Sequence, residues 1–388
     1  MSESSGMAIR FDEGPVAVLY QEVPPPVVGG IRKPKKPGGY SDSGADIAYA
    51  LSKAGVPVAT PCKEPDPREA MAWVFPDTLE GIRCAIDIGA RTLWANTVLF
   101  RGHPIQEAAE QGFGIVGQEP GRVHVHDDKA VTNALIARND CRVPASILVS
   151  VGFESKGVAI DAVSNQGLAD HGLSFPLVLK PIRGRGSEGV TRVESIESLR
   201  RAASELFGST IEVDGKNTQK YGNQLILEEY LPGDELTLTV MPPGQYSIGG
   251  MTTSFENYWP LPAVARFNHL GGIAPYNGVV AVTRNSRVLT EVEDTDPALA
   301  RLLPQVKRAA RLVGARAPIR VDCRRAEDGE FRLFDLNMKP NMTGAGRPGR
   351  DTQDSLSLIA ARKIGWRFED LLINMLHQAW NGDGGQSV

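Results

Sequence analysis

The sequence is short of the features that mark secreted, membrane-spanning or nucleic-acid-binding proteins. Among its 388 residues are only four cysteines, far apart and with no CxxC pair, which argues against a disulfide framework or a cysteine zinc site. No apolar run approaches the length that crosses a bilayer, and the first 25 residues lack the apolar core of a signal peptide. The 42 basic and 46 acidic residues are interspersed, with no basic cluster among aromatics. We therefore expect a cytoplasmic protein without membrane or nucleic-acid partners.

What the chain does contain is enough apolar sequence for two or three domains, since 41% of it is hydrophobic. In roughly the first 120 residues, strand-like runs alternate with helical spacing. Ser43–Ala54 predicts a helix that ends at a left-handed cap on Gly55. The alternation predicts a mostly parallel sheet and continues through Val16–Tyr20, Val56–Thr60, Thr78–Gly89, Thr92–Asn96 and Gly114–Gly117.

After a further predicted helix, Lys129–Asn139, the pattern changes to short strands in adjacent pairs. This pattern predicts an α+β region of antiparallel strand pairs, which ends in helices near Ser355–Ile364 and Phe368–Trp380. The expected pairs are Leu177–Lys180 with Thr191–Val193, Gln224–Glu229 with Leu236–Val240, and Ile319–Arg324 with Phe331–Asn337.

The segment Gly184–Gly189 matches GxGxxG, a pattern whose meaning depends on the element that comes after it. A dinucleotide fingerprint needs a helix directly after the loop, but the β-branched run Val190–Val193 predicts a strand. The Walker A pattern and the HRD and DFG tripeptides of protein kinases are absent. A strand ending in Lys180, a glycine loop and a second strand remain. Glycines let backbone N–H groups approach phosphate oxygens, although a glycine-rich surface hairpin shows the same pattern.

One predicted hairpin places two carboxylates opposite each other. Asp328-Gly329 is a two-residue turn signal, and with that turn Asp322 faces Asp335 while Arg320 faces Asn337 on the same side of the sheet. Opposed carboxylates repel unless they are solvated, one is protonated, or a cation lies between them. Two aspartates and an asparagine suit Mg²⁺, and the arginine is placed to hold an anionic oxygen beside it. An exposed acidic hairpin is the alternative.

Taken in order, these segments resemble the ATP-grasp superfamily, and its D-alanine–D-alanine ligase-like branch most closely. The resemblance covers roughly residues 112–380, with motifs at Asp127-Asp128-Lys129, Phe175–Gly189, Ile226–Glu235, Arg320–Asn337 and Lys339–Thr343, and an acceptor-side segment at Ser355–Arg362. It implies a parallel α/β domain over residues 1–124 followed by a two-lobed ATP-grasp fold with antiparallel sheets. The small lobe would cover residues 125–228 and the large lobe, with the metal and substrate site, residues 229–382.

The resemblance also implies the members of the site. Phosphate groups of ATP would be held by Lys129, Lys180, Gly184, Gly186, Ser187 and Gly189. The adenine and ribose would contact Glu228, the backbone of Glu229 and Leu231, and Glu235. One or two Mg²⁺ ions, with Mn²⁺ as a substitute, would bind Asp322, Asp335 and Asn337. Catalysis would rest on Arg320 and Lys180, with Arg266 as a further phosphate-binding cation, and substrate contacts would include Asn341 and Ser355.

Two departures leave the substrate open. Asp335 stands where the family has glutamate, and residues 344–354 form an insertion that is longer than in D-alanine ligases. Within it, Arg347 and Arg350 suit bidentate capture of a substrate carboxylate or phosphonate, although a solvated basic loop fits equally. Asn96 and Thr97, at a strand end, are further candidates for contact with substrate.

The function implied by the resemblance is ligation of a carboxylate substrate, an amino acid or small peptide-like acid, to an amine. The reaction would pass through an acyl-phosphate and release ADP and phosphate. A phosphotransferase acting on a small molecule and a nucleotide-binding protein without turnover are the alternatives. Dimerisation through the N-terminal domain is common in the family, so a homodimer is a further expectation.

Overall fold

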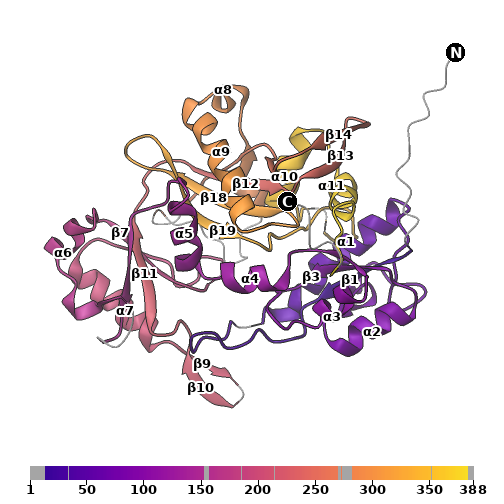
Figure 1. The fold of residues 1–388 in the computed structure, drawn as a ribbon, viewed down its shortest axis with the longest axis horizontal. Helices are drawn as coiled ribbons and strands as arrows, with labels where there is room; N and C mark the ends of the chain where they lie inside the picture. The colour runs from indigo at the N-terminus through magenta and orange to yellow at the C-terminus, as the bar shows by residue number, and fades with distance from the viewer. Residues whose placement is uncertain are drawn as a thin grey trace.

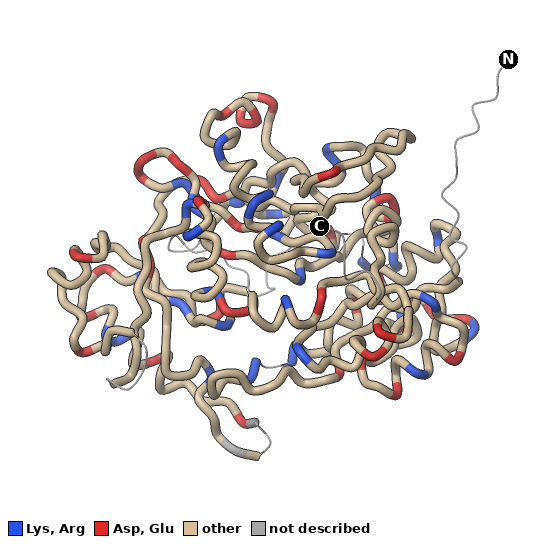
Figure 2. Tube along the Cα trace, in the orientation of Figure 1, with Lys and Arg blue, Asp and Glu red and all other residues tan. Residues whose placement is uncertain are grey.

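Three β-sheets form the frame of the protein in the computed structural model, which describes residues 14–33, 35–152, 157–184, 186–213, 215–269, 272, 282–350 and 352–382 (Figure 1). Basic and acidic residues are interspersed along the described part of the trace, as the sequence predicts (Figure 2). Within the described ranges no helix is long and apolar enough to cross a membrane.

The first sheet is parallel and has four strands. Its order is β2-β1-β3-β4, so β1 and β3 are the central strands and β2 and β4 are the edges. Every neighbouring pair is parallel. The elements of this region are β1 Val16–Tyr20, η1 Pro37–Tyr40, α1 Ser41–Lys53, η2 Ala70–Ala72, β2 Phe75–Pro76, α2 Leu79–Asp87, β3 Thr92–Asn96, α3 Ile105–Glu110 and β4 Gly114–Val116. The expected parallel sheet is confirmed.

The local expectations in this region hold with one exception. Gly55, with a φ of 83°, follows α1 as the predicted left-handed cap. The strand expected over Val56–Thr60 is wrong, because only Val58 makes an isolated bridge, to Val16. Pro57 has no N–H to donate and contributes only its carbonyl, which accepts from the Val16 N–H.

The second sheet has five strands in the order β6-β5-β11-β7-β8. Its buried face packs against α6 and α7 around a separate apolar core. The predicted antiparallel pair across the glycine loop, β7 with β8, is confirmed. This part of the chain contains β5 Ser146–Ser150, β6 Val158–Ala159, η3 Ile160–Ala162, α6 Asn165–Asp170, β7 Leu177–Pro181, β8 Thr191–Val193, α7 Ile196–Gly208, the hairpin β9 Thr210–Val213 with β10 Lys216–Gln219, and β11 Gln224–Glu229.

The third sheet has six strands, with the path β17-β16-β12-β18-β19 and β15 paired to β12. Helix α9 covers one face, and α5 packs against both α9 and β19. Its elements and the remaining ones are α4 Pro120–His126, α5 Lys129–Ala137, β12 Glu235–Met241, β13 Gly244–Ile248, β14 Met251–Phe255, β15 Trp259–Pro260, β16 Val264–Arg266, η4 Val282–Arg284, β17 Ser286–Val288, α8 Glu291–Asp294, α9 Pro297–Leu312, β18 Ile319–Arg325, β19 Phe331–Asn337, α10 Leu356–Lys363 and α11 Phe368–Leu376.

One predicted pairing is wrong. Strands β11 and β12, expected to pair with each other, belong to different sheets: β11 lies between β5 and β7, and β12 lies against β18 and β16. Between them, Pro232 cannot donate to a ladder, and the Gly233 N–H donates to the Arg325 carbonyl of the six-stranded sheet. The short connection therefore crosses from one sheet to the other instead of turning back.

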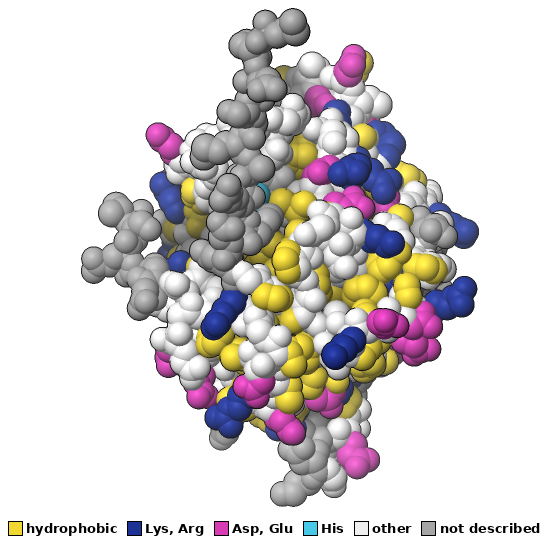
Figure 3. Space-filling model, turned by 90° about the vertical axis from the view of Figure 1, so that its right-hand side faces the viewer, with side chains coloured by type: hydrophobic (Ala, Val, Ile, Leu, Met, Phe, Trp, Pro, Cys, Tyr) yellow, Lys and Arg dark blue, Asp and Glu magenta, His cyan; other side chains and the backbone are white. Residues whose placement is uncertain are grey.

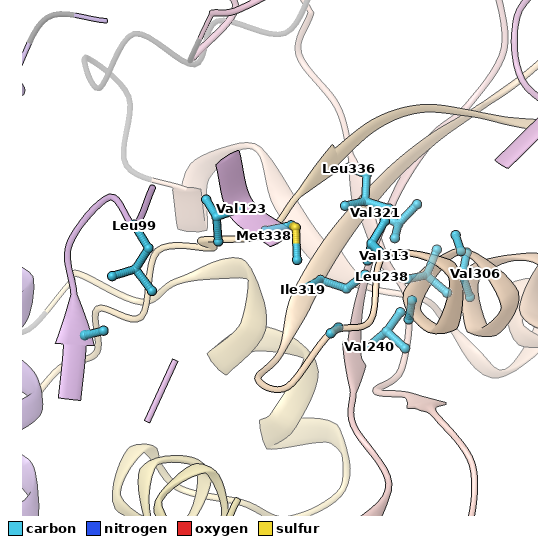
Figure 4. Close-up of a cluster of buried hydrophobic side chains, with 14 of the residues drawn as sticks. Leu99, Val123, Leu238, Val240, Val306, Val313, Ile319, Val321, Leu336 and Met338 are labelled. Atoms are coloured by element: carbon cyan, nitrogen blue, oxygen red, sulfur yellow. The ribbon is translucent and has the colours of Figure 1, made fainter. Parts of the chain in front are cut away.

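A continuous apolar core joins the first sheet to the six-stranded sheet. Met338, directly after β19, lies between Leu99 and Val123 on one side and the Val321 and Leu336 side chains on the other (Figure 4). The segment after β19 is therefore anchored at the junction of the N-terminal region and the six-stranded sheet.

Candidate functional site

The hairpin of β18 and β19 carries the opposed carboxylates that the sequence predicts. Asp322 lies opposite Asp335, and Arg320 lies opposite Asn337. Across the other edge of β18, Thr237 of β12 also lies opposite Asp322. Because directly opposed residues share a face, these side chains gather on one side of the sheet.

The turn of this hairpin is longer than predicted. The Ala326 N–H donates to the Glu330 carbonyl (2.9 Å), so the loop holds three residues rather than the expected pair Asp328-Gly329. A β-bulge leaves Phe334 without a cross-strand partner. The longer turn and the bulge offset each other by one residue, and the carboxylates face each other as expected.

Each of the two carboxylates has a cation of the chain beside it. Lys129 Nζ lies 2.5 Å from Asp335 Oδ1, and Arg320 donates from Nε and Nη2 to the two oxygens of Asp322 at 3.1 and 2.9 Å. The Thr237 hydroxyl donates to Asp322 Oδ1 (2.7 Å). Burial raises the pKa of Asp335, but the nearby Lys129 charge and hydrogen bond outweigh it and hold the pKa below its ordinary value. Asp335 is therefore anionic at neutral pH, as a metal ligand would need to be.

The second predicted lysine, Lys180, is buried where the two antiparallel sheets meet. Its Nζ lies 2.6 Å from Glu228 Oε1 and donates to the Phe334 carbonyl at the bulge (3.1 Å). Burial raises the pKa of Glu228 more than the lysine lowers it. Within the described residues, Glu228 Oε2 is buried and has no hydrogen-bond partner. That oxygen is available to accept from a ligand, as the adenine amino group would require.

The glycine loop joins β7 to β8 as predicted. Gly186, Ser187 and Gly189 have φ values of 61°, 58° and 74°. Gly184 lies at the start of the loop, and Arg185 lies outside the described residues. The backbone therefore takes a left-handed course that glycine allows at little cost. A phosphate-binding role of this loop stays a prediction.

Gly189→Ala should destabilise the protein by about 1–3 kcal/mol, from left-handed strain and overpacking together. An added Cβ would lie 2.9 Å from Pro181 Cγ and 3.1 Å from a Leu206 methyl. Urea unfolding measures the loss. Gly172→Ala is the control because its φ is 69° but the space around it is open. Equal losses in the two variants would show that packing at Gly189 contributes nothing.

The predicted ribose residue, Glu235, lies at the start of β12 on the same face as the carboxylates. Its cross-strand neighbours are Arg266 on one side and Arg324 on the other, and His269 Nε2 lies 2.9 Å from its Oε2. Arg266 is buried beside Glu235, so the predicted cation lies on the same face of the six-stranded sheet as the carboxylates. Leu231 lies buried in the crossing between the sheets.

Part of the predicted adenine-reading backbone is already in use. The Glu229 N–H donates to the Ala145 carbonyl (2.9 Å), so this N–H does not serve a ring edge while that bond is made.

The predicted substrate residues Asn341 and Ser355 lie in the segment between β19 and α10, and the start of α10 contacts this face of β12, since Ser357 Oγ lies 2.9 Å from Thr239 Oγ1. Asn341 is exposed, and its amide donates to the Thr343 hydroxyl (3.0 Å). Ser355 is buried and caps α10, since its hydroxyl accepts from the Leu358 N–H (3.2 Å). The cap uses one acceptor position of the hydroxyl, so its hydrogen is still able to donate to a substrate.

The arginines of the insertion do bind a carboxylate, but one of the chain itself. Arg347 Nε lies 2.9 Å and Arg350 Nε 2.7 Å from Asp46 Oδ1, in the middle of α1. Arg347 is only 3% exposed and also contacts Asp42 and the Pro67 carbonyl. The two guanidiniums join the insertion to α1, and their proposed role in substrate choice stays a prediction. The sequence could not reveal a partner so distant.

Other contacts of the site had no local signal in the sequence. Asp127, within the first lysine segment, contacts Lys33 (2.5 Å) from the proline-rich segment after β1 and Arg183 (3.3 Å) from the start of the glycine loop. Thr237 had no local signal either. The strand alternation that placed Asp322 could also have placed Arg324, which lies two residues further along on the same face.

A model of the D-ala D-ala ligase C-terminus family matches residues 152–377, more than half of the chain. The chain belongs to this family. The matched residues carry β7, the glycine loop, β11, β12 and the carboxylate hairpin.

Two curated relatives show how far the similarity extends. The D-alanine–D-alanine ligase of Actinobacillus succinogenes is 29% identical over 204 residues, which is 53% of this chain and 54% of that ligase. The one from Parabacteroides distasonis is 30% identical over 172 residues, 44% of either chain. The chain thus spans about half the length of the curated relatives it matches.

Solved structures confirm the fold over nearly the whole chain. The D-alanine–D-alanine ligase of Bacillus anthracis, complexed with ATP, aligns with a TM-score of 0.59 at 16% identity, covering 94% of this chain and 96% of that one. The VanG D-Ala:D-Ser ligase of Enterococcus faecalis aligns with a TM-score of 0.57 at 14% identity, covering 94% and 98%. The predicted fold class, with an ATP-grasp architecture, is confirmed.

The donor set fits the magnesium that the family implies. Asp322, Asp335 and Asn337 present oxygen atoms only, from two carboxylates and one amide on one face. No group of three or more His, Cys, Asp and Glu side chains suited to a metal occurs within the described ranges. With three protein ligands, phosphate and water would complete the coordination of Mg²⁺. Mg²⁺ favours such sites, which are incomplete without substrate phosphates.

Proposed function

We propose that the protein is an ATP- and Mg²⁺-dependent carbon–nitrogen ligase that joins a carboxylate substrate to an amine. The observation that carries the proposal is the convergence of two lysines on one hairpin. Lys129 contacts Asp335, and Lys180 contacts the adjacent Phe334 carbonyl, while Arg320 and Asp322 lie on the facing strand. Family membership and the names of the relatives support the same reaction.

In the proposed reaction a carboxylate oxygen attacks the γ-phosphorus of ATP, and the bond to the β-phosphate oxygen breaks. An acyl-phosphate and ADP result. The amine nitrogen then attacks the acyl carbon, loses a proton, and phosphate leaves. Lys129 and Lys180 bind phosphate oxygens, and the glycine loop 184–189 covers them and excludes water. Arg320 donates to the oxyanion that forms at the acyl carbon.

The proposal includes the metal and nucleotide contacts, which the same geometry supports. Mg²⁺ held by Asp322, Asp335 and Asn337 would neutralise charge on the transferred phosphoryl group. Glu228 Oε2 would accept from the adenine amino group, and Glu235 would accept from the ribose hydroxyls. Arg266, buried beside Glu235, supplies further positive charge.

The substrates we propose are small amino acids or short peptide-like acids. The curated relatives are named for D-alanine, but Asp335 in place of glutamate and the insertion over residues 344–354 argue against assuming that amino acid. A small-molecule phosphotransferase is a weaker candidate, because stabilising a carbonyl oxyanion, the role proposed for Arg320, is not required for transfer to a hydroxyl.

The organisation of the whole protein is part of the proposal. We place the domain limits at residues 1–124, 125–228 and 229–382, and the ATP requirement suits a cytoplasmic enzyme. A homodimer is also part of the proposal. In its support, hydrophobic side chains gather between scattered charges on the face that Figure 3 shows.

The direct test is a product assay with MgATP and pooled amino acids, dipeptides and small acids. We expect ADP release that requires two pool members together, with a product lighter than their sum by one water. Asp335→Ala and Lys180→Ala should abolish it, because each removes a group that touches phosphate or metal. Asp328→Ala, in the exposed turn of the same hairpin, is the matched control and should keep full activity.

Other products would decide against ligation. AMP in place of ADP would exclude the acyl-phosphate route. ADP together with a phosphorylated small molecule, and no condensed product, would make the protein a phosphotransferase.

A further inference from the structure

The segment after β1 runs from the parallel sheet to the five-stranded sheet (Figure 1). We call residues 22–33 the strap. Its three consecutive prolines, Pro24–Pro26, favour a stiff, extended chain and lack N–H donors. A recess of about 30 Å³ remains between the strap and residues 98–100, so the strap is not packed continuously onto the rest of the protein. The contacts at its two ends therefore decide where it lies.

The start of the strap is bonded to the buried Asp77 at the end of β2. Asp77 Oδ1 accepts from the N–H groups of Glu22 and Val23, both at 2.7 Å. Burial raises the pKa of Asp77, but hydrogen bonds from His103, Thr97 and the Val23 N–H outweigh it and hold the pKa below its ordinary value. A charged carboxylate of the parallel sheet therefore holds this end of the strap.

A two-residue turn brings the strap against the five-stranded sheet. Val28 and Ile31 exchange both backbone hydrogen bonds (2.9 and 3.1 Å) around Gly29 and Gly30, whose φ values are 59° and 78°. Positive φ at both central residues is typical of a type I′ turn. The buried Ile31 side chain lies against Gly222, between β10 and β11, where an added Cβ would be 2.7 Å from Ile31 Cδ1. The glycine leaves the room that Ile31 occupies.

The strap ends in an ion-pair cluster beside the glycine loop. Lys33 Nζ lies 2.5 Å from Asp127 Oδ1, and Arg183 Nη1 lies 3.3 Å from Asp127 Oδ2. Arg183 directly precedes Gly184, and its Nη2 lies 3.6 Å from Asp128 Oδ2. The side chains of Lys33 and Arg183 are only 10% and 11% exposed, so salt screens these pairs less than it screens surface pairs.

Asp127 also lies close to the first of the lysines proposed to bind phosphate. The Lys129 N–H donates to the Ile182 carbonyl (3.2 Å), just before the glycine loop. Burial lowers the pKa of Lys129, but the charge and hydrogen bond of Asp335, followed by the charge of Asp127, raise it more. The cluster therefore connects the strap both to Lys129 and to the start of the glycine loop.

We propose that Lys33 and Asp127 are positioning residues, through which the strap holds Lys129 and the start of the glycine loop in place for phosphoryl transfer. The inference rests on the proposed ligase function. Lys33 offsets the negative charge of Asp127, which would otherwise weaken the positive potential at Lys129. Asp127 in turn holds Arg183 at the start of the loop.

The position of the loop matters because the loop excludes water from the acyl-phosphate. Where the loop is held less firmly, water attacks the acyl carbon, loses a proton and displaces phosphate, which regenerates the carboxylate substrate. ADP is then released without a condensed product. The ratio of product to ADP therefore reports on the position of the loop.

The test compares the wild type with Lys33→Met, Lys33→Arg, Asp127→Asn and the double variant Lys33→Met/Asp127→Asn. Lys35→Met is the matched control, because Lys35 pairs with Glu22 of the strap (2.9 Å) and its side chain is 37% exposed. Isothermal titration with MgADP measures affinity without turnover. ADP and condensed product are then counted together, with the substrate pair that the pooled assay identifies.

We expect Lys33→Met to weaken MgADP binding about 5- to 150-fold, the usual range of coupling between separate sites, and to release more ADP than product. The wild type and Lys35→Met should form one product per ADP, and Lys33→Arg should restore most of the coupling. Because Lys33 acts through Asp127, the double variant should bind MgADP no more weakly than Asp127→Asn alone. The Tm without nucleotide should change little, since a pair partly open to water contributes little stability.

Four results would overturn the proposal: unchanged MgADP affinity in Lys33→Met, an equal loss in Lys35→Met, additive losses in the double variant, or a Tm without nucleotide that falls together with the affinity. MgADP affinity that depends on Lys33, with no condensed product from any pool, would instead refute the ligase function and leave the positioning role standing.

Discussion

Arg320→Leu should lower kcat for ligation about 100- to 1000-fold, the usual cost of removing one oxyanion donor. KM for ATP should change little, because the two lysines and Glu228 that would hold the nucleotide are untouched. Arg320→Lys keeps the charge but loses the planar pair of donors that now meets both Asp322 oxygens, so it should recover only part of the rate. Steady-state ADP release at saturating ATP measures the effect.

Arg332→Leu controls for changes in the hairpin itself. Arg332 lies on β19, and its guanidinium pairs with Asp328 at the turn (2.6 Å), away from the carboxylate pair. Its kcat should match the wild type. If the whole effect of Arg320→Leu falls on KM for ATP, then Arg320 binds nucleotide and stabilises no oxyanion.

Asp46→Ala should destabilise the folded protein by about 3–5 kcal/mol, because it leaves the buried Arg347 guanidinium without its carboxylate. Asp46 is 1% exposed and Arg347 is 3% exposed, so water cannot replace the lost partner. Denaturant unfolding, followed by tryptophan fluorescence, measures the loss. Asp42→Ala is the control, because the side chain of Asp42 is 68% exposed and an exposed pair contributes only about 0–1 kcal/mol.

The double variant Asp46→Leu/Arg347→Met distinguishes the net free energy of the ion pair from the cost of leaving one buried charge unpaired. Removing both charges should restore much of the stability lost in Asp46→Ala, since a buried ion pair contributes little net free energy. If the single and double variants lose the same amount, the guanidinium is satisfied by its other contacts and the ion pair is not the cause.

How well the sequence predicted the structure depends on the separation of the interacting residues. The β18–β19 hairpin is local, so a turn signal and strand alternation placed Asp322 opposite Asp335, with the turn length and the bulge as compensating errors. Strand β12 pairs with β18 across 85 residues at Thr237 and Asp322, and no local pattern encodes that distance. Proximity along the chain instead favoured the wrong β11–β12 pair.

The same limit applies to the candidate site. The lysines, glycine loop and metal ligands each lie in a segment with its own composition, and they could be proposed one by one. Arg347 and Asp46 are 301 residues apart. Nothing in the sequence around either residue indicates a partner, so only the structure reveals that they pair. The roles of the predicted site residues stay predictions that the assays above address.

The protein's own carboxylates already occupy the two lysines proposed to bind phosphate. Lys129 is paired with Asp335, and Lys180 is paired with Glu228 and with a carbonyl of the six-stranded sheet. When a nucleotide binds, its phosphates would replace Asp335 and Glu228 as the anionic partners of the two lysines, instead of displacing water alone. Its affinity is then the difference between two electrostatic energies. Lys180 in addition joins the two antiparallel sheets, because it lies on β7 and donates to the Phe334 carbonyl of β19.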